Sequence, residues 1–215
     1  MWSAPGLPDG EPAPLLVVHD GPEYATLGDL ITFLATGTAA GTLPPLRAAL
    51  LGPLERNAWY SANPAYADAL ATRLLPVLPP ATARIGVGVS LGALAMLHAH
   101  RRIGLDGLFL QSGSFFTAQY DPQERGFDGF AAVSSFVARL HDASGDRHPV
   151  PTVLTCGLVE ENLANNRAMA ATLGRLGYGT RLVEVRDAHN FTAWRDALDP
   201  HLPELLSRAV ARRAA

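Results

Sequence analysis

The 215-residue sequence contains no lysine and only one cysteine, Cys156. Without a lysine amine, the chain cannot form a Schiff base, anchor pyridoxal phosphate or make the Walker-type contact to a phosphate. A lone cysteine excludes an intramolecular disulfide and a CxxC metal site, and it is typical of a reducing compartment. We therefore expect a cytoplasmic protein.

Strong net charge and long hydrophobic runs are also missing. The 17 basic and 20 acidic residues leave a net charge of −3, so no overall field favours nucleic acid or an anionic membrane. The N-terminal stretch MWSAPGLPDGEPAP has no positive charge ahead of an apolar run, which is not the pattern of a secretory signal. The longest uncharged stretch, residues 30–46, is rich in Thr, Gly and Pro and is too short to span a membrane. We expect neither nucleic acid nor a membrane as a partner.

Hydrophobic residues make up 48% of the sequence, enough for the core of a single domain over residues 1–215. Short apolar segments alternate with longer segments of helical periodicity, which is typical of βα units around a parallel sheet. The expected strands are residues 15–19, 46–51, 84–89, 107–111, 152–156 and 181–185. The expected helices are residues 24–35, 64–78, 91–102, 129–141, 162–176 and 192–212, and residues 115–128 are expected to form a loop over one end of the sheet. The sequence thus predicts an α/β fold with a doubly wound, mainly parallel sheet of about six strands.

The residues from Gly88 to Gly92 have the pattern GxSxG, with Ser90 between an expected strand and an expected helix. A serine on such a tight turn, the nucleophile elbow, projects its hydroxyl out of the sheet, and the flanking glycines allow the close backbone approach that the turn needs. The alternative is that Ser90 merely caps the helix. If Ser90 is a nucleophile, the backbone N–H of Leu91 is one expected donor to the oxyanion.

A serine nucleophile needs a histidine base and an acid that orients the base, in the chain order Ser, Asp/Glu, His for this fold. One expected strand runs into Glu160 and Glu161, and the next runs into Asp187 and His189. Both strand ends lie on the edge of the sheet that carries Ser90. We favour His189 over the six other histidines. Position alone separates Glu160 from Glu161 only weakly, and Asp187 is a third candidate that is better suited to forming a turn.

Several further patterns lie at strand ends and loops. They are a strand ending in His19-Asp20-Gly21, the sequence QSGS at residues 111–114, Gly157 followed by Glu160, His189 followed five residues later by Trp194, and Arg56 followed by Tyr60, Asn63 and Pro64, with Trp59 in place of an acid before Tyr60. Together with GxSxG, these patterns resemble the esterase family of α/β-hydrolases that includes enterochelin esterases, feruloyl esterases, S-formylglutathione hydrolases and antigen 85 mycolyltransferases. The resemblance covers about residues 15–206.

This resemblance implies the α/β-hydrolase fold and a serine carboxylic ester hydrolase. It implies Ser90 as the nucleophile, His189 as the base and Glu160 as the acid, favoured over Glu161 by its distance from Gly157. The expected partner is a small-molecule ester, either small or siderophore-like and aromatic, and neither a cofactor nor a metal is required. Acyl transfer by the same serine and a non-catalytic ligand-binding role are the alternatives.

The resemblance also leads to expectations about the oxyanion hole, the N-terminal strands and the substrate pocket. The second oxyanion donor is expected in the loop after residues 15–19, where Pro22 has no N–H, so either Gly21 or Glu23 donates instead or the oxyanion hole is weak. The antiparallel strands that usually precede the first central strand are expected to be missing or trimmed, which leaves an exposed sheet edge and makes a homodimer an expectation. The residues expected to line the substrate pocket are Tyr24, Arg56, Tyr60, Phe115 and Phe116, with Tyr120 on the cover loop. For each aromatic residue the alternative is ordinary packing in the core or at the rim. For Arg56 the two alternatives are contact with a substrate carboxylate and pairing with an acid of the protein.

Overall fold

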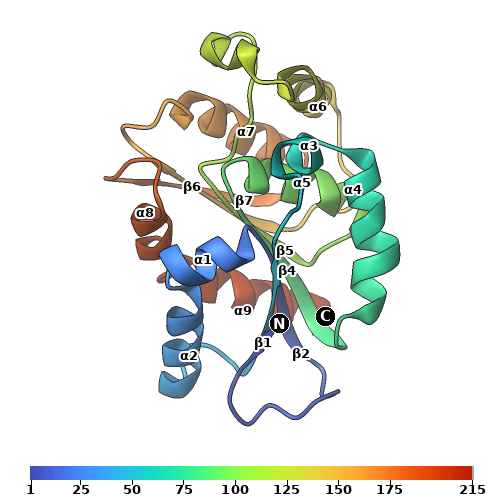
Figure 1. Cartoon of the computed structure of the whole chain (residues 1–215), viewed down its shortest axis with the longest axis vertical. Coiled ribbons are helices and arrows are strands. Elements are labelled where there is room, and N and C mark those ends of the chain that lie inside the picture. Colours follow the sequence, from blue (N-terminus) through green and yellow to red (C-terminus); the bar gives the residue numbers. More distant parts are fainter. Residues whose placement is uncertain (215) are drawn as a thin grey trace.

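The computed structural model describes residues 1–214, and its strands form one seven-stranded sheet in the order β1-β3-β2-β4-β5-β6-β7 (Figure 1). All pairings are parallel except that of β1 with β3. The strands are β1 (Trp2–Ser3), β2 (Ala13–His19), β3 (Arg47–Leu51), β4 (Ala81–Val89), β5 (Gly107–Gln111), β6 (Pro151–Gly157) and β7 (Gly179–Val185). The predicted α/β class with a mainly parallel sheet is confirmed.

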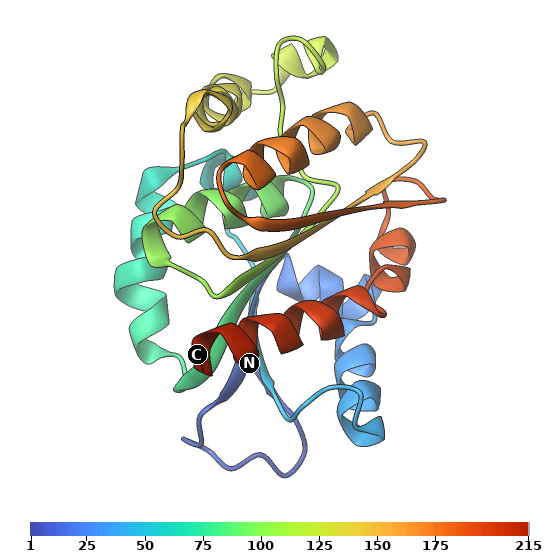
Figure 2. The same cartoon turned by 180° about the vertical axis from the view of Figure 1, so that it is seen from behind.

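Helices cover both faces of this sheet, as Figures 1 and 2 show from opposite sides. One face carries α3 (Arg56–Tyr60), α4 (Pro64–Ala69), α5 (Leu91–Ile103), α6 (Phe130–Asp142) and α7 (Leu163–Arg175). The other carries α1 (Gly21–Leu27), α2 (Leu30–Ala40), α8 (Phe191–Asp196) and α9 (His201–Ala214). Strand β2 serves both layers, because Leu15 and Val17 pack on the first face while Leu16 and Val18 pack on the second.

The six expected strands are all present, and the structure adds a short antiparallel one. Strand β1 pairs Trp2 with Ala48 and Ser3 with Arg47 at the edge of the sheet. An antiparallel edge strand therefore does precede the first central strand, although it has only two residues.

Two of the expected helices are interrupted. The first is divided into α1 and α2 at Gly28, where a Cβ would lie 2.3 Å from the ring of Tyr24, so a side chain does not fit at this turn. The last is divided into α8 and α9 around Pro200, which has no N–H to continue a helical hydrogen-bond ladder. The expected helix at residues 64–78 begins as predicted, with Asn63 Oδ1 accepting from the N–H of Ala65 (2.9 Å), but continues as a π-helical turn (Leu70–Leu74) and a 3₁₀ turn (Leu75–Val77).

The strand order places the predicted catalytic residues along one edge of the sheet. Strands β4, β5, β6 and β7 are neighbours, so the segments that follow their carboxyl ends lie side by side. These segments carry Ser90, the QSGS sequence, Glu160 and His189. Within residues 1–214, no helix combines the length and apolar character needed to cross a membrane.

Candidate active site

Ser90 occupies a tight turn between β4 and α5. Its φ of 53° and ψ of −125° form a strained backbone conformation that a serine adopts only under constraint. Gly88 is sterically required, because a Cβ there would lie 2.4 Å from the carbonyl oxygen of Gly92, and Gly92 is tightly packed, since a Cβ there would lie 2.9 Å from Asp20 Oδ2. The Ser90 side chain makes no capping hydrogen bond to α5. The geometry is therefore that of an elbow and not of a helix cap.

The Ser90 hydroxyl has one side-chain partner within residues 1–214, the hydroxyl of Ser114 at 3.2 Å. Ser114 also donates its backbone N–H to the carbonyl oxygen of Ser90 (3.1 Å), which holds the QSGS segment against the elbow. His189 is not within hydrogen-bonding distance of Ser90 Oγ in this arrangement. The sequence patterns gave no role to Ser114, although its place in QSGS at a strand end was a usable signal.

The structure brings Glu160 together with His189. Glu160 Oε2 lies 2.7 Å from His189 Nδ1, and the Glu160 side chain is only 1% exposed. The other carboxylate oxygen, Oε1, accepts from Ser112 Oγ and from the N–H of Gly157, each at 2.7 Å. Burial acts to raise the pKa of Glu160, but the three hydrogen bonds outweigh burial and hold that pKa below its usual value. Glu161 is exposed and makes no such contact.

Gly157 and Asp187 explain why the turn that carries Glu160 and the turn that carries His189 approach so closely. A Cβ on Gly157 would lie 2.2 Å from the carbonyl oxygen of Asp187, so only glycine fits where the two turns meet. The Asp187 carboxylate accepts from the N–H of Ala188 (2.7 Å) and from Asn190 Nδ2 (3.2 Å). Asp187 therefore shapes the turn, as expected, and His189 remains 41% exposed at its side chain.

The two backbone N–H groups predicted as oxyanion donors, those of Leu91 and Gly21, both lie at the start of a helix. Leu91 and Gly21 are the first residues of α5 and α1, so neither N–H has an acceptor within its own helix. Within residues 1–214, neither N–H makes another backbone or side-chain hydrogen bond. Gly21 is constrained because a Cβ there would lie 2.4 Å from the Cα of Leu50. Pro22 follows as the second residue of α1.

His19 links the loop after β2 to the elbow and is not available as a base. Its Nδ1 donates to the carbonyl oxygen of Gly92 (2.8 Å), and its Nε2 lies 2.9 Å from the hydroxyl of Tyr66. Burial lowers the pKa of His19 to about 4, so the ring is neutral near pH 7 and Nε2 accepts from Tyr66. Sequence patterns did not identify Tyr66, which lies far from His19 along the chain.

The predicted substrate contacts need correction. Tyr24, Tyr60 and Phe115 have no exposed surface, and Phe116 is only 7% exposed. The Tyr24 hydroxyl donates to Gln111 Oε1 inside the core. These side chains pack in the interior and cannot touch a substrate in this arrangement. The error arose because an aromatic residue near a strand end can point into the core as easily as into a pocket.

Arg56 is engaged inside the protein. Its Nε and Nη2 donate to the two carboxylate oxygens of Asp20 at 2.8 and 2.7 Å, and its guanidinium lies 5.5 Å from the centroid of the Tyr60 ring. Of the two roles considered for Arg56, the structure displays the pairing with an acid. Tyr120 remains partly exposed on the cover loop.

The described residues contain no cluster of three or more His, Cys, Asp and Glu side chains able to hold a metal. Burial raises the pKa of the Cys156 thiol to about 12, so this thiol is not a competing nucleophile.

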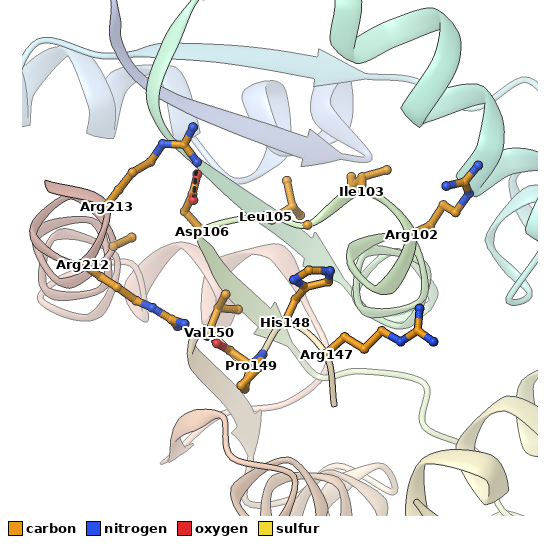
Figure 3. A pocket seen from close by; sticks show the side chains of 12 residues that line it. Arg102, Ile103, Leu105, Asp106, Arg147, His148, Pro149, Val150, Arg212 and Arg213 are labelled. Atoms are coloured by element: carbon orange, nitrogen blue, oxygen red, sulfur yellow. Dashed lines mark hydrogen bonds and ion pairs between the residues drawn. The ribbon is translucent and has the colours of Figure 1, made fainter. Parts of the chain in front are cut away.

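A cavity of about 470 Å³ lies at the opposite end of the sheet, where the chain enters β5 and β6 (Figure 3). Three of its four arginines have partners within the protein. Arg213 pairs with Asp106 (2.9 Å), Arg212 donates to the carbonyl oxygen of Pro149 (2.5 Å), and Arg102 pairs with Asp68 (2.6 Å). In Figure 3 the guanidinium groups of Arg102 and Arg147 point away from the cavity. No convergent anion site is formed, and the cavity is separate from Ser90.

No protein-family model matches the chain, and no curated protein sequence matches it significantly. Solved structures do match. An enterobactin esterase from Shigella flexneri, crystallised in the presence of enterobactin, is 22% identical over 96% of this chain and 54% of its own, with a TM-score of 0.79. A ferulic acid esterase is 16% identical over 91% of this chain and 84% of its own (TM-score 0.71). An S-formylglutathione hydrolase from Staphylococcus aureus is 12% identical over 94% and 83% (TM-score 0.63).

These structures agree with the resemblance drawn from the sequence motifs. The chain spans about half the length of the enterobactin esterase structures that it matches. At identities this low, the similarity establishes architecture. With a mostly parallel sheet, helices on both faces and a serine elbow after β4, the chain has the α/β-hydrolase fold that these esterases share.

Proposed function

We propose that this protein is a serine carboxylic ester hydrolase that works through Ser90, His189 and Glu160. The observation that carries the proposal is a strained serine elbow after β4 together with a hydrogen bond between the buried Glu160 and His189, which follow β6 and β7 at the same edge of the sheet. The esterases among the similar structures support the same reaction class.

In the proposed mechanism, Ser90 Oγ attacks the ester carbonyl carbon while His189 Nε2 takes the hydroxyl proton. This step requires the Ser90 side chain to turn away from Ser114, its present partner, and toward His189. The carbonyl oxygen becomes an oxyanion and accepts hydrogen bonds from the N–H groups of Leu91 and Gly21. His189 then protonates the leaving alcohol, and an acyl-enzyme remains on Ser90.

Hydrolysis of the acyl-enzyme repeats these steps with water. His189 takes a proton from water as the water oxygen attacks the acyl carbon, and then returns a proton to Ser90 Oγ as the acid is released. Glu160 stays ionised throughout and stabilises the protonated imidazole. No metal or cofactor takes part in this sequence.

The substrate class that we propose is a small ester or an aromatic, siderophore-like ester. Support comes from the similar structures, which include esterases named for enterobactin and for ferulic acid. Because Arg56 is held by Asp20, a substrate carboxylate is not part of the proposal.

Turnover of p-nitrophenyl acetate and p-nitrophenyl butyrate tests the reaction, with Ser90→Ala as the control. We expect hydrolysis by the wild type, none by the variant, and labelling of Ser90 by a fluorophosphonate probe. Product analysis with an added alcohol or amine separates hydrolysis from acyl transfer. If the wild type turns over neither ester and Ser90 stays unlabelled, the hydrolase proposal is wrong and a non-catalytic role is favoured.

A further inference from the structure

The side chains behind Glu160 form a chain of hydrogen bonds with a single direction. Trp194 Nε1 donates to Ser112 Oγ (2.9 Å), and Ser112 Oγ lies 2.7 Å from Glu160 Oε1. An indole N–H can only donate, so Ser112 Oγ accepts from Trp194 and its one proton is left for Glu160. The chemistry of the groups thus determines the direction of both bonds.

The direction continues to His189. Glu160 Oε1 also accepts from the N–H of Gly157 (2.7 Å), which leaves Oε2 to face His189 Nδ1 at 2.7 Å. An ionised carboxylate only accepts hydrogen bonds, so His189 Nδ1 must carry a proton and donate it. His189 Nε2 then keeps its lone pair, which is the tautomer that a general base needs to deprotonate a serine.

We propose that Ser112 and Trp194 are positioning residues that act through Glu160 to fix the orientation and the tautomer of His189. The proposal rests on the hydrolase function proposed above, because only then does the tautomer of His189 matter for turnover. Neither residue touches the reacting atoms. Both hold the acid that orients the base.

Burial and packing make this chain rigid. Ser112 is 1% exposed and Trp194 is 6% exposed, so bulk water does not compete for their hydrogen bonds. The Ser112 backbone is held by its N–H, which donates to the carbonyl oxygen of Thr155 (2.7 Å), and by its carbonyl oxygen, which accepts from Asn162 Nδ2 (3.2 Å). An acid held by such a chain has one orientation.

Trp194 also meets the base directly. Its ring packs edge-on against the imidazole of His189, with centroids 5.0 Å apart and an interplanar angle of 84°. His189 precedes α8 and Trp194 lies within it, and the helix begins where Asn190 Oδ1 accepts from the N–H of Ala193 (2.9 Å). One indole therefore supports the catalytic pair from behind, through Ser112, and from the side, against the ring.

Single and double variants test the chain. Ser112→Ala removes its middle member, and we expect kcat to fall about 10-fold to 100-fold, the cost of one hydrogen bond to a charged group, with KM changed less than about twofold. Trp194→Phe keeps an aromatic ring but removes the indole N–H, and we expect a fall of about 3-fold to 10-fold. The double variant should match Ser112→Ala within about twofold, because the chain is already broken.

A matched control separates positioning from general loss of stability. Thr152 is buried on β6, and its hydroxyl donates to the carbonyl oxygen of Val150 (3.1 Å), away from Glu160. Thr152→Val also removes a buried hydroxyl, so we expect it to lower the melting temperature but to leave kcat within about twofold of the wild type.

The ¹H–¹⁵N NMR signal of His189 Nδ1–H gives a readout that does not depend on turnover. We expect a strongly deshielded, slowly exchanging proton in the wild type, and a signal that shifts upfield or exchanges away in Ser112→Ala and Trp194→Phe. Failure of the hydrolase proposal would abolish turnover but leave this NMR behaviour intact. Should Ser112→Ala fail to fold, Trp194→Phe decides. Variants that keep wild-type kcat and the wild-type Nδ1–H signal would overturn the proposal.

Discussion

Replacing Glu160 by glutamine tests the proposed acid with almost no change in side-chain volume. Two donors face Oε1, from Ser112 and Gly157, so the amide oxygen of glutamine must occupy that position and its NH₂ group must face His189. His189 Nδ1 would then have to accept a hydrogen bond, which places the ring proton on Nε2 and removes the lone pair that deprotonates Ser90.

The magnitude follows from the lost charge. Two unit charges about 4 Å apart interact by about 4 kcal/mol at an effective dielectric constant near 20, and the carboxylate stabilises the imidazolium of the transition state by this order. We therefore expect kcat on p-nitrophenyl butyrate to fall by about 10³-fold, with a small change in KM.

Glu161→Gln is the matched control, because Glu161 is the neighbouring residue but is exposed to solvent. Its kcat should stay within about twofold of the wild type, since a solvated charge contributes little. Circular dichroism and melting temperature confirm that both variants are folded. If Glu161→Gln were the damaging change and Glu160→Gln kept its activity, the assignment of the acid and the chain of donors behind it would both be wrong.

Three further predictions concern stability and binding. Burial lowers the pKa of His19 from 6.5 to about 4, so below pH 6.5 the unfolded chain binds a proton that the folded chain does not. The free energy of unfolding should therefore fall by about 2 kcal/mol between pH 7 and pH 5 because of this residue. Urea denaturation of His19→Gln should show a correspondingly smaller dependence of stability on pH. Gly157→Ala places a Cβ 2.2 Å from a backbone oxygen and should cost more than about 2 kcal/mol in thermal unfolding, whereas Gly174→Ala, in α7 with nothing within 4 Å, should stabilise the protein by about 0.5–1 kcal/mol. Arg56→Ala leaves the nearly buried Asp20 carboxylate unpaired and should lower the melting temperature without raising KM for anionic esters more than for neutral ones; a selective rise for anionic esters would restore Arg56 as a substrate contact.

The parts of the fold that could be predicted from sequence were those set by local pattern. Apolar strands closed by Gly, Ser or Asp located the strand ends, and a parallel sheet gathers such ends on one edge, so Ser90, Glu160 and His189 could be placed on the same edge. The helix breaks at Gly28 and Pro200 were missed, because helical periodicity continues across both. The glycine at residue 28 reflects contact with the Tyr24 ring, which is a tertiary contact.

The details of the site depended on contacts between distant segments. Glu160 and Glu161 differ by one position, and the choice between them follows from the N–H of Gly157 and the hydroxyl of Ser112. Ser112 lies 48 residues from Glu160, and Trp194 lies 82 residues from Ser112, so no spacing rule connects them. The aromatic pocket failed for the same reason, because only packing shows that Tyr24, Tyr60 and Phe115 face the core.

Two buried polar clusters flank Ser90, and each permits one arrangement of protons. On the β2 side, the carbonyl oxygen of Gly92 can only accept, so His19 donates from Nδ1 and accepts from Tyr66 at Nε2, staying neutral beside the loop that supplies Gly21. On the β6 side, the indole N–H of Trp194 can only donate, so Ser112 accepts from Trp194 and donates to Glu160. The ionised Glu160 in turn accepts from His189 Nδ1.

The side chains of Ser90 and His189, which react in the proposed mechanism, are less confined than these two buried polar clusters. The His189 side chain is 41% exposed while that of Glu160 is 1% exposed, and Ser90 Oγ shares a single hydrogen bond with Ser114. A base held from behind by a buried acid, with its other face open, can accept a proton from Ser90 and deliver it to a leaving alcohol without breaking a buried contact. In the proposed mechanism, the motion that catalysis requires is therefore limited to the Ser90 side chain and the exposed face of His189.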